Sequence, residues 1–167
     1  MMPALWEVLA QGEVQFVLLG TGQSQYEQAA AQLGQEFPDR TAIYLAFSEA
    51  LAEKIYAALD IFLMPSLFEP CGIGQMISMR YGGLPLVRAV GGLVDTVPAD
   101  VGFLFDAYDA GALGWALQDA LYRYNNDQDK WRERQQRAMK LDFSWDESAR
   151  QYTALYEEAI EIHKRYQ

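Results

Sequence analysis

Residues 65–75, Pro-Ser-Leu-Phe-Glu-Pro-Cys-Gly-Ile-Gly-Gln, contain the side chains and amides best suited to chemistry. Glu69 is held by the proline after it and stands just before an expected helix. The amides of Gly72, Ile73 and Gly74 would be unpaired donors of the first helical turn, which suits an anion or a sugar hydroxyl. A carboxylate beside them repels phosphate but accepts hydrogen bonds from hydroxyls. The segment fits a ligand with a sugar next to a phosphate; an acidic residue favoured by the helix dipole is the plain alternative.

Two glycine-containing turns are further candidates for ligand contact. Gly20 and Gly22 follow a short apolar run, but Gln25 stands where a dinucleotide fingerprint would have its third glycine. A tight turn between a strand and a helix is therefore the simpler interpretation. Gly91 and Gly92 lie between an apolar run and a short expected helix, which suits a second anion-binding turn, with an ordinary loop as the alternative.

Other reactive groups are scarce. Cys71 and His163 are the single cysteine and the single histidine, so neither an internal disulfide nor a Cys/His zinc cluster can form. Cys71 has no base near it in sequence to make it a nucleophile. Asp127 and Asp129 form a D-x-D pattern, which binds a metal in some transferases, but here the pattern opens an expected helix and capping is the better interpretation.

The elements that must position these residues alternate in type. Short apolar runs at 16–19, 41–47, 61–64, 84–87 and 102–105 predict strands, and helical patterns cover 24–33, the segment capped by Ser48, and 73–81. This alternation predicts an α/β fold with a Rossmann-like, doubly wound parallel sheet. The candidate turns follow strands, so they would meet at the carboxyl edge, where ligands bind. After residue 106 the pattern is helical, and Ser144 with Glu147 predicts a capping box for a final helix.

Length and charge restrict the class of protein. The 167 residues predict one domain over residues 1–167, and the net charge of −10 argues against nucleic acid as a partner. No apolar run is long enough to span a bilayer, and the first residues lack a basic signal-peptide region. We therefore expect no membrane partner. Residues 1–10 read as the end of a helix, so we expect the first strand of the sheet to be missing and the chain to be a fragment of a longer enzyme.

The candidate loops together resemble one family. The stretches Phe-Glu-Pro-Cys-Gly at 68–72, Gly-Gly-Leu at 91–93 and Asp-Phe-Ser-Trp at 142–145 look like the C-terminal domain of bacterial glycogen synthases and plant starch synthases. The resemblance covers nearly the whole chain. It implies the C-terminal lobe of a GT-B glycosyltransferase, in which two Rossmann-like lobes enclose the active site.

The resemblance also implies an activity and a set of roles. These enzymes transfer glucose from ADP-glucose or UDP-glucose to the 4-hydroxyl of an α-1,4-glucan with retention, without a metal ion or other cofactor, in the bacterial cytoplasm or the plastid stroma. Glu69 would be the catalytic residue at the donor sugar, and Phe47 would stack on the base. Without the resemblance, a core phenylalanine at the end of a strand is an equally good interpretation of Phe47. The implied donor-sugar and diphosphate contacts are Gly20, Gly22, Cys71, Gly72, Ile73, Gly74, Gly91, Gly92 and Leu93.

Some positions depart from the family pattern. Gly74, Gly83 and Val90 stand where threonine is common. At Gly74 this removes a hydroxyl that could reach the implied diphosphate, and at Val90 it removes one beside the glycine pair. The glucan acceptor would be held by the N-terminal lobe, so we expect the isolated chain to be inactive. Two alternatives stay open: a non-catalytic module for carbohydrate or protein association, and another GT-B transferase with a different acceptor. Ile77, where sucrose-synthase-type transferases have a second glutamate, disfavours that type.

Overall fold

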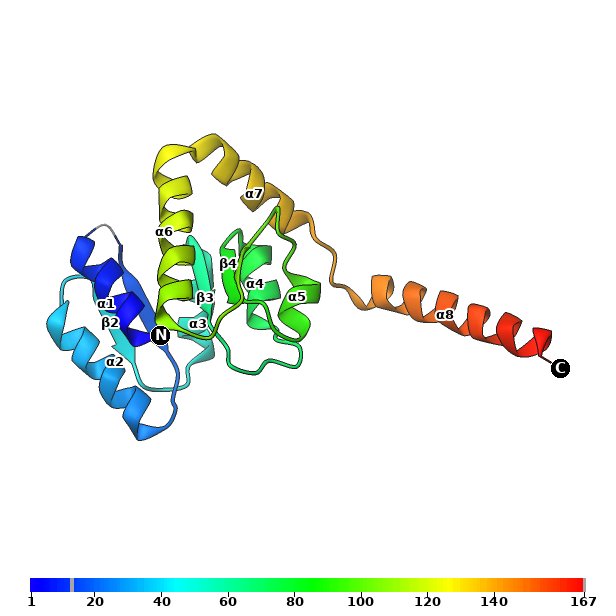
Figure 1. Ribbon diagram of the computed structural model, residues 1–167, viewed down its shortest axis with the longest axis horizontal. Helices are drawn as coiled ribbons and strands as arrows, with labels where there is room; N and C mark the ends of the chain where they lie inside the picture. The colour runs from blue at the N-terminus through cyan, green and yellow to red at the C-terminus, as the bar shows by residue number, and fades with distance from the viewer. Residues whose placement is uncertain (13, 167) are drawn as a thin grey trace.

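The computed structural model describes residues 1–12 and 14–166 (Figure 1). The elements in chain order are α1 (Met2–Gln11), β1 (Phe16–Leu19), α2 (Ser24–Glu36), β2 (Thr41–Tyr44), α3 (Glu49–Ala58), β3 (Ile61–Met64), α4 (Gly74–Tyr81), β4 (Leu84–Arg88), α5 (Gly92–Thr96), β5 (Phe103–Phe105), α6 (Ala110–Asn126), α7 (Gln128–Lys140) and α8 (Trp145–Arg165). All strand pairs are parallel, as the alternation of strands and helices predicted. The second strand ends at Tyr44, earlier than the predicted residue 47.

The parallel strands form two hydrogen-bonded sheets, where the sequence predicted one. β1 pairs with β2, and β4 lies between β3 and β5. A doubly wound sheet of order 3-2-1-4-5-6 places its first strand between the second and the fourth. With β1 to β5 as strands two to six of that order, the break between β1 and β3 is the position of strand one. Among the described residues no strand occupies that position, and β1 and β3 are not hydrogen-bonded to each other.

The inner edge of β1 is open. The amides of Phe16 and Gly20 donate to carbonyls of Arg40 and Tyr44 at 2.8 and 3.0 Å. Peptide groups alternate in direction along a parallel strand. The groups of the intervening residues, 17 and 19, therefore point away from β2 and toward the gap.

The open edge leaves neighbouring side chains exposed. Val17 in β1 is 44% exposed, whereas Leu86 and Val87 in the central strand β4 are fully buried. Every residue of β3 is partly exposed, because β3 has a partner on the β4 side only. Strands of a complete parallel sheet are covered on both faces, so burial rises from the gap toward β4.

Helices connect the two sheets in place of a shared ladder. α1 packs along α6, and α6 covers β4 and β5. α3 contacts β1 and also packs on α4, which lies over β3 and β4. Trp131 of α7 is buried against Phe103 and Tyr124, with ring centroids 5.9 and 5.1 Å away. The main core therefore lies between α1, α6, α7 and the sheet of β3, β4 and β5.

The last helix, α8, extends away from this body (Figure 1). It has no buried residue, and Trp145, Tyr152, Tyr156 and Ile160 of its apolar face are exposed. The predicted cap is present in part: Ser144 Oγ accepts a hydrogen bond from Glu147 N at 3.3 Å. The return bond of a capping box is replaced, because Ser144 N donates to Asp142 Oδ1 at 2.8 Å. None of the described helices is long and apolar enough to cross a bilayer.

Candidate functional site

Glu69 and a set of free amides lie together after β3. The loop from residue 65 ends at α4, whose N-cap Ile73 provides no side-chain cap. Within the described residues, the amides of Gly72, Ile73 and Gly74 donate to no protein acceptor. Glu69 is partly buried at the same edge. One loop thus contains both a carboxylate acceptor and unpaired amide donors.

Gln75 orients this loop from inside the protein. Its side chain is fully buried, and Nε2 donates to the carbonyl oxygens of Cys71 at 3.2 Å and Gly72 at 3.0 Å. With these carbonyls turned inward, the free amides are left for the outer side. Gly72 has φ of 76°, and a Cβ there would stand 2.6 Å from Gln75 Oε1. Only glycine meets both requirements at this position.

The loop after β3 touches the turn after β4 through backbone atoms. Gly92 N donates to the carbonyl oxygen of Pro70 at 3.2 Å. Gly91 has φ of 51°, and a Cβ on it would overlap the carbonyl oxygen of Glu69. A Cβ on Gly92 would lie 2.6 Å from the Cα of Cys71. The glycine pair is therefore required for two chain segments to approach closely, a reason that sequence reasoning did not identify.

The amides of this turn are partly occupied. Besides the Gly92 bond, Leu93 N donates to Val90 O at 3.2 Å, and the Leu93 side chain is fully buried beside Val87 and Val97. A diphosphate that used the Gly92 or Leu93 amide would compete with a carbonyl. The contact role expected of this turn stays a prediction.

Arg88 is a residue that the sequence reasoning missed. It ends β4, and its Nη1 donates to the carbonyl oxygens of Leu67 at 2.9 Å and Ser66 at 3.3 Å. Its Nε donates to Asp106 O at 3.0 Å, and its guanidinium lies 5.6 Å from the ring centre of Tyr108. Arg88 therefore fixes the start of the Glu69 loop and brings a cation to the strand edge. A charged residue at the end of a buried strand was the available signal.

Gly20, Gly22 and Phe47 follow the strands of the other sheet. Gly22 N donates to Glu27 Oε1 at 2.9 Å, so a carboxylate already occupies this amide. A Cβ on Gly20 or Gly22 would meet nothing within 4 Å. Phe47 is 86% exposed, which leaves its ring available for stacking. The structure brings together Glu69, Cys71, Gly91 and Gly92. No described hydrogen bond links Gly20, Gly22 or Phe47 to these four residues.

Two of the unusual glycines have their space filled by neighbours. A Cβ on Gly74 would lie 2.8 Å from Phe62 Cζ and 3.1 Å from the Tyr56 hydroxyl. Burial raises the pKa of Tyr56, which keeps that hydroxyl protonated. A Cβ on Gly83 would overlap Leu59 Cδ1. The departures from threonine at 74 and 83 are thus matched to the packing around them.

The D-x-D pattern is a helix cap, as predicted. Asp127 Oδ1 accepts a hydrogen bond from Lys130 N at 3.3 Å, and Asp127 Oδ2 pairs with Lys130 Nζ at 2.6 Å. These contacts lower the pKa of the Asp127 carboxyl. Across residues 1–12 and 14–166, no three His, Cys, Asp or Glu side chains gather as a metal site would require.

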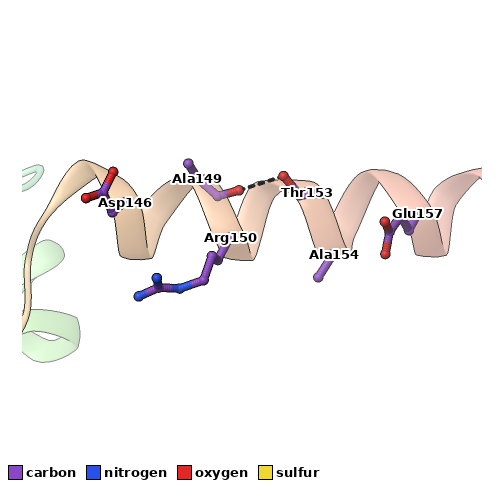
Figure 2. A pocket seen from close by; sticks show the side chains of 6 residues that line it. All are labelled: Asp146, Ala149, Arg150, Thr153, Ala154 and Glu157. Carbon is purple, nitrogen blue, oxygen red and sulfur yellow. Dashed lines mark hydrogen bonds between the residues drawn. The ribbon is translucent and has the colours of Figure 1, made fainter.

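A shallow hollow lies along α8, away from these loops. Figure 2 shows its lining, in which Ala149, Thr153 and Ala154 lie among the charged residues Asp146, Arg150 and Glu157. All six belong to one helix, so no second element forms an opposite wall. The Thr153 hydroxyl donates to Ala149 O at 2.9 Å, a bond within the helix. This surface is not an enclosed binding site.

Comparison with known proteins gives relatives along most of the chain. The glycogen synthase of Streptococcus gordonii is 48% identical over 157 residues, which is 90% of this chain and 33% of the relative. That of Fervidobacterium nodosum is 44% identical over 165 residues, which is 95% of this chain and 34% of the relative. The chain therefore spans about a third of the length of the curated relatives it matches.

Solved structures agree with the fold. The catalytic domain of starch synthase IV from Arabidopsis thaliana, bound to ADP and acarbose, superposes with a TM-score of 0.81 at 38% identity. That match covers 95% of this chain and 35% of the other. Anabaena HepE in complex with UDP and glucose has a TM-score of 0.65 at 22% identity and shares the fold. The GT-B C-terminal-lobe fold expected from the sequence is confirmed.

Residues 2–138 match the family described as glycosyl transferases group 1. The match begins in α1 and ends in α7, so it includes all the strands and both loops that meet at Glu69. On this match, together with the fold, the chain belongs to the group 1 glycosyl transferases.

Proposed function

We propose that this chain is the donor-binding lobe of a glycogen or starch synthase, and that it binds ADP-glucose or UDP-glucose at the carboxyl edge of its strands. The observation that carries the proposal is the juxtaposition of Glu69 with the free amides of Gly72, Ile73 and Gly74. The 38% identical starch synthase IV domain was solved with ADP, which supports an adenine nucleotide as the first donor to test. The bacterial glycogen synthases support glucose as the sugar.

Each half of such a donor has a matching group. Sugar hydroxyls would donate to the Glu69 carboxylate and accept from the amides at the start of α4. The diphosphate would lie toward the turn at Gly91, with Arg88 supplying positive charge nearby. Phe47 offers an exposed ring to the base, and stacking of this kind contributes about 1–3 kcal/mol.

The reaction proposed for the whole protein is a transfer with retention. The bond between the anomeric carbon and the diphosphate oxygen breaks, and a bond to the 4-hydroxyl oxygen of the glucan forms. The proton of that hydroxyl leaves with the nucleoside diphosphate. Negative charge grows on the leaving diphosphate, and amide donors aimed at it would lower the barrier. No metal or other cofactor enters this proposal.

The acceptor glucan would be held by a second lobe, so the 167-residue chain alone should transfer no glucose. Radiolabelled ADP-glucose with a glycogen primer tests this expectation. Incorporation above that of a Glu69→Ala variant would contradict it. We place the whole protein in the bacterial cytoplasm or the plastid stroma, with nucleotide sugar as its small-molecule partner.

The binding site itself is tested on the chain by amide chemical-shift titration with ADP-glucose and with UDP-glucose. We expect shifts in residues 20–22, 69–74 and 91–93. Glu69→Gln should weaken binding of the nucleotide sugar, because an amide replaces the hydroxyl acceptor at equal size. Glu49→Gln, at the start of α3, is a control with the same change of charge.

The outcome that contradicts the site is equally specific. Shifts confined to α6, α7 and α8 at saturating nucleotide would remove the loops from the site. Shifts in α8 on addition of glucan, with none from nucleotide, would instead favour the non-catalytic association module.

A further inference from the structure

A hydrogen-bonded chain connects the two loops of the site through buried side chains. Gln75 Nε2 holds the carbonyls of Cys71 and Gly72, and it also donates to Thr96 Oγ1 at 2.9 Å. Thr96 Oγ1 in turn donates to the carbonyl oxygen of Gly92 at 2.7 Å. These hydrogen bonds therefore connect the carbonyls of Cys71 and Gly72, beside the free amides, to Gly92, the first residue of α5.

The connection leaves the hydrogen-bonding groups of the Gln75 side chain unequally satisfied. Its amide nitrogen has two hydrogens for three acceptors, while Oε1 is buried and finds no hydrogen-bond partner among the described residues. An unpaired buried oxygen is unfavourable, and such groups are rare in folded proteins. The acceptors on both loops thus hold the side chain in an orientation that leaves its Oε1 without a hydrogen bond among the described residues.

We infer that Gln75 and Thr96 are positioning residues that set the spacing between the sugar side of the site, at residues 72–74, and the diphosphate side, at residues 91–93. The inference rests on the proposed function. A ligand that spans both sides needs the correct spacing, whereas a ligand that occupies the diphosphate side alone does not. The two classes of ligand should therefore respond differently when the connection is cut.

Thr96→Val cuts this side-chain connection and leaves the direct backbone bond from Gly92 N to Pro70 O in place. It removes the hydroxyl at nearly constant volume, and Gln75 Nε2 keeps the carbonyls of Cys71 and Gly72 as acceptors for its two hydrogens. We expect the Kd for ADP-glucose to rise about tenfold and the Kd for ADP to stay within about twofold. Thr96→Ser keeps a hydroxyl and should restore binding of ADP-glucose.

The chain offers a matched control for the lost helix bond. Thr153 in α8 donates to the carbonyl four residues earlier at 2.9 Å (Figure 2). Thr96 makes the same kind of bond in α5. Thr153→Val removes that bond far from the loops and should leave both Kd values unchanged. Gln75→Met is a second test of the connection, since it deletes the donor together with the unpaired oxygen. It should give the same difference between ADP-glucose and ADP.

Several results would overturn the inference. Equal weakening of both ligands in Thr96→Val, or no weakening of either, contradicts a role in spacing. Failure of the unmodified chain to bind either ligand contradicts the proposed function. The role in spacing is then tested by amide chemical shifts recorded without ligand. Thr96→Val must shift the amides of Gly72 and Ile73. Thr96→Ser and Thr153→Val must leave those amides unshifted. Unshifted amides in Thr96→Val would exclude positioning whether or not a ligand binds.

Discussion

The amide of Gly92 donates to the carbonyl of Pro70 at 3.2 Å, and this bond joins the turn after β4 to the loop after β3. The two segments approach each other so closely at Gly91 and Gly92 that no side chain would fit at either position. A turn that resembles an anion-binding site in sequence thus also packs directly against the loop after β3. Both properties follow from exposed backbone, which can approach a ligand or another backbone equally well.

Gly91→Ala should destabilise the protein strongly. The alanine Cβ would overlap the carbonyl oxygen of Glu69, and φ of 51° is unfavourable for any residue with a Cβ. We expect a loss of about 2–4 kcal/mol in the free energy of unfolding, measured by urea denaturation. Gly22→Ala is the control, since its Cβ would meet nothing within 4 Å. Equal stability of the two variants would contradict the close contact.

Gly83→Thr, which introduces the residue common in the family, should destabilise this chain. Leu59 occupies the space, and Ser78 Oγ would lie 2.7 Å from the new Cβ. Overpacking of this kind costs about 1–3 kcal/mol. Leu59→Ala in the same chain should recover part of the loss, and a double-mutant cycle by thermal or urea unfolding measures the coupling. Strict additivity of the two changes would show that Leu59 does not fill the position.

Two strand valines should respond differently to truncation. Val87→Ala should cost about 2 kcal/mol, because Val87 is fully buried in the central strand β4. Val17→Ala should cost less than about 1 kcal/mol, because Val17 is 44% exposed beside the gap. Urea unfolding of both variants gives the comparison. A cost at Val17 as large as that at Val87 would mean that the gap is covered in solution.

The first turn of α8 should lose helicity in acid. The hydrogen bond from Ser144 lowers the pKa of Asp142, and the hydrogen bond from Arg150 lowers that of Glu147. A carboxyl with a lowered folded-state pKa stabilises the fold above its unfolded value and loses that effect as the pH falls. We therefore expect helical chemical shifts in residues 145–150 to decline below about pH 4.

Variants of α8 make this pH dependence specific. Glu147→Gln should reduce the change, because it removes one of the titrating groups. Glu158→Gln, later in the same helix, should leave the change as it is. A decline that starts at the C-terminal end of α8 would contradict the assignment.

Local sequence signals were sufficient for most elements. Ser48 and Asp127 were expected to cap helices, and their side chains accept the expected amides. The helical pattern expected to end at residue 81 does so, and Gly82 after it has the left-handed conformation of a C-cap. Helix caps depend on residues a few positions apart, so they can be predicted from a single sequence.

Contacts between distant segments could not be predicted in the same way. The bonds of Gln75 to Thr96 and of Arg88 to Leu67 join residues 21 positions apart in the sequence. Their side chains pair only after the strands have been placed side by side, and no spacing rule within one element specifies them. The sequence also predicted one sheet where the structure has two, because the pairing of β1 with β3 depends on how distant strands are placed and not on the residues of either strand.

The gap between β1 and β3 also affects how the chain behaves in concentrated solution. Each strand edge presents unpaired peptide groups to any extended segment, including one from another copy. The net charge of −10 opposes such encounters. At physiological ionic strength this repulsion is screened beyond about 8 Å. Added salt should therefore promote aggregation of this acidic protein, and low ionic strength should keep it dispersed.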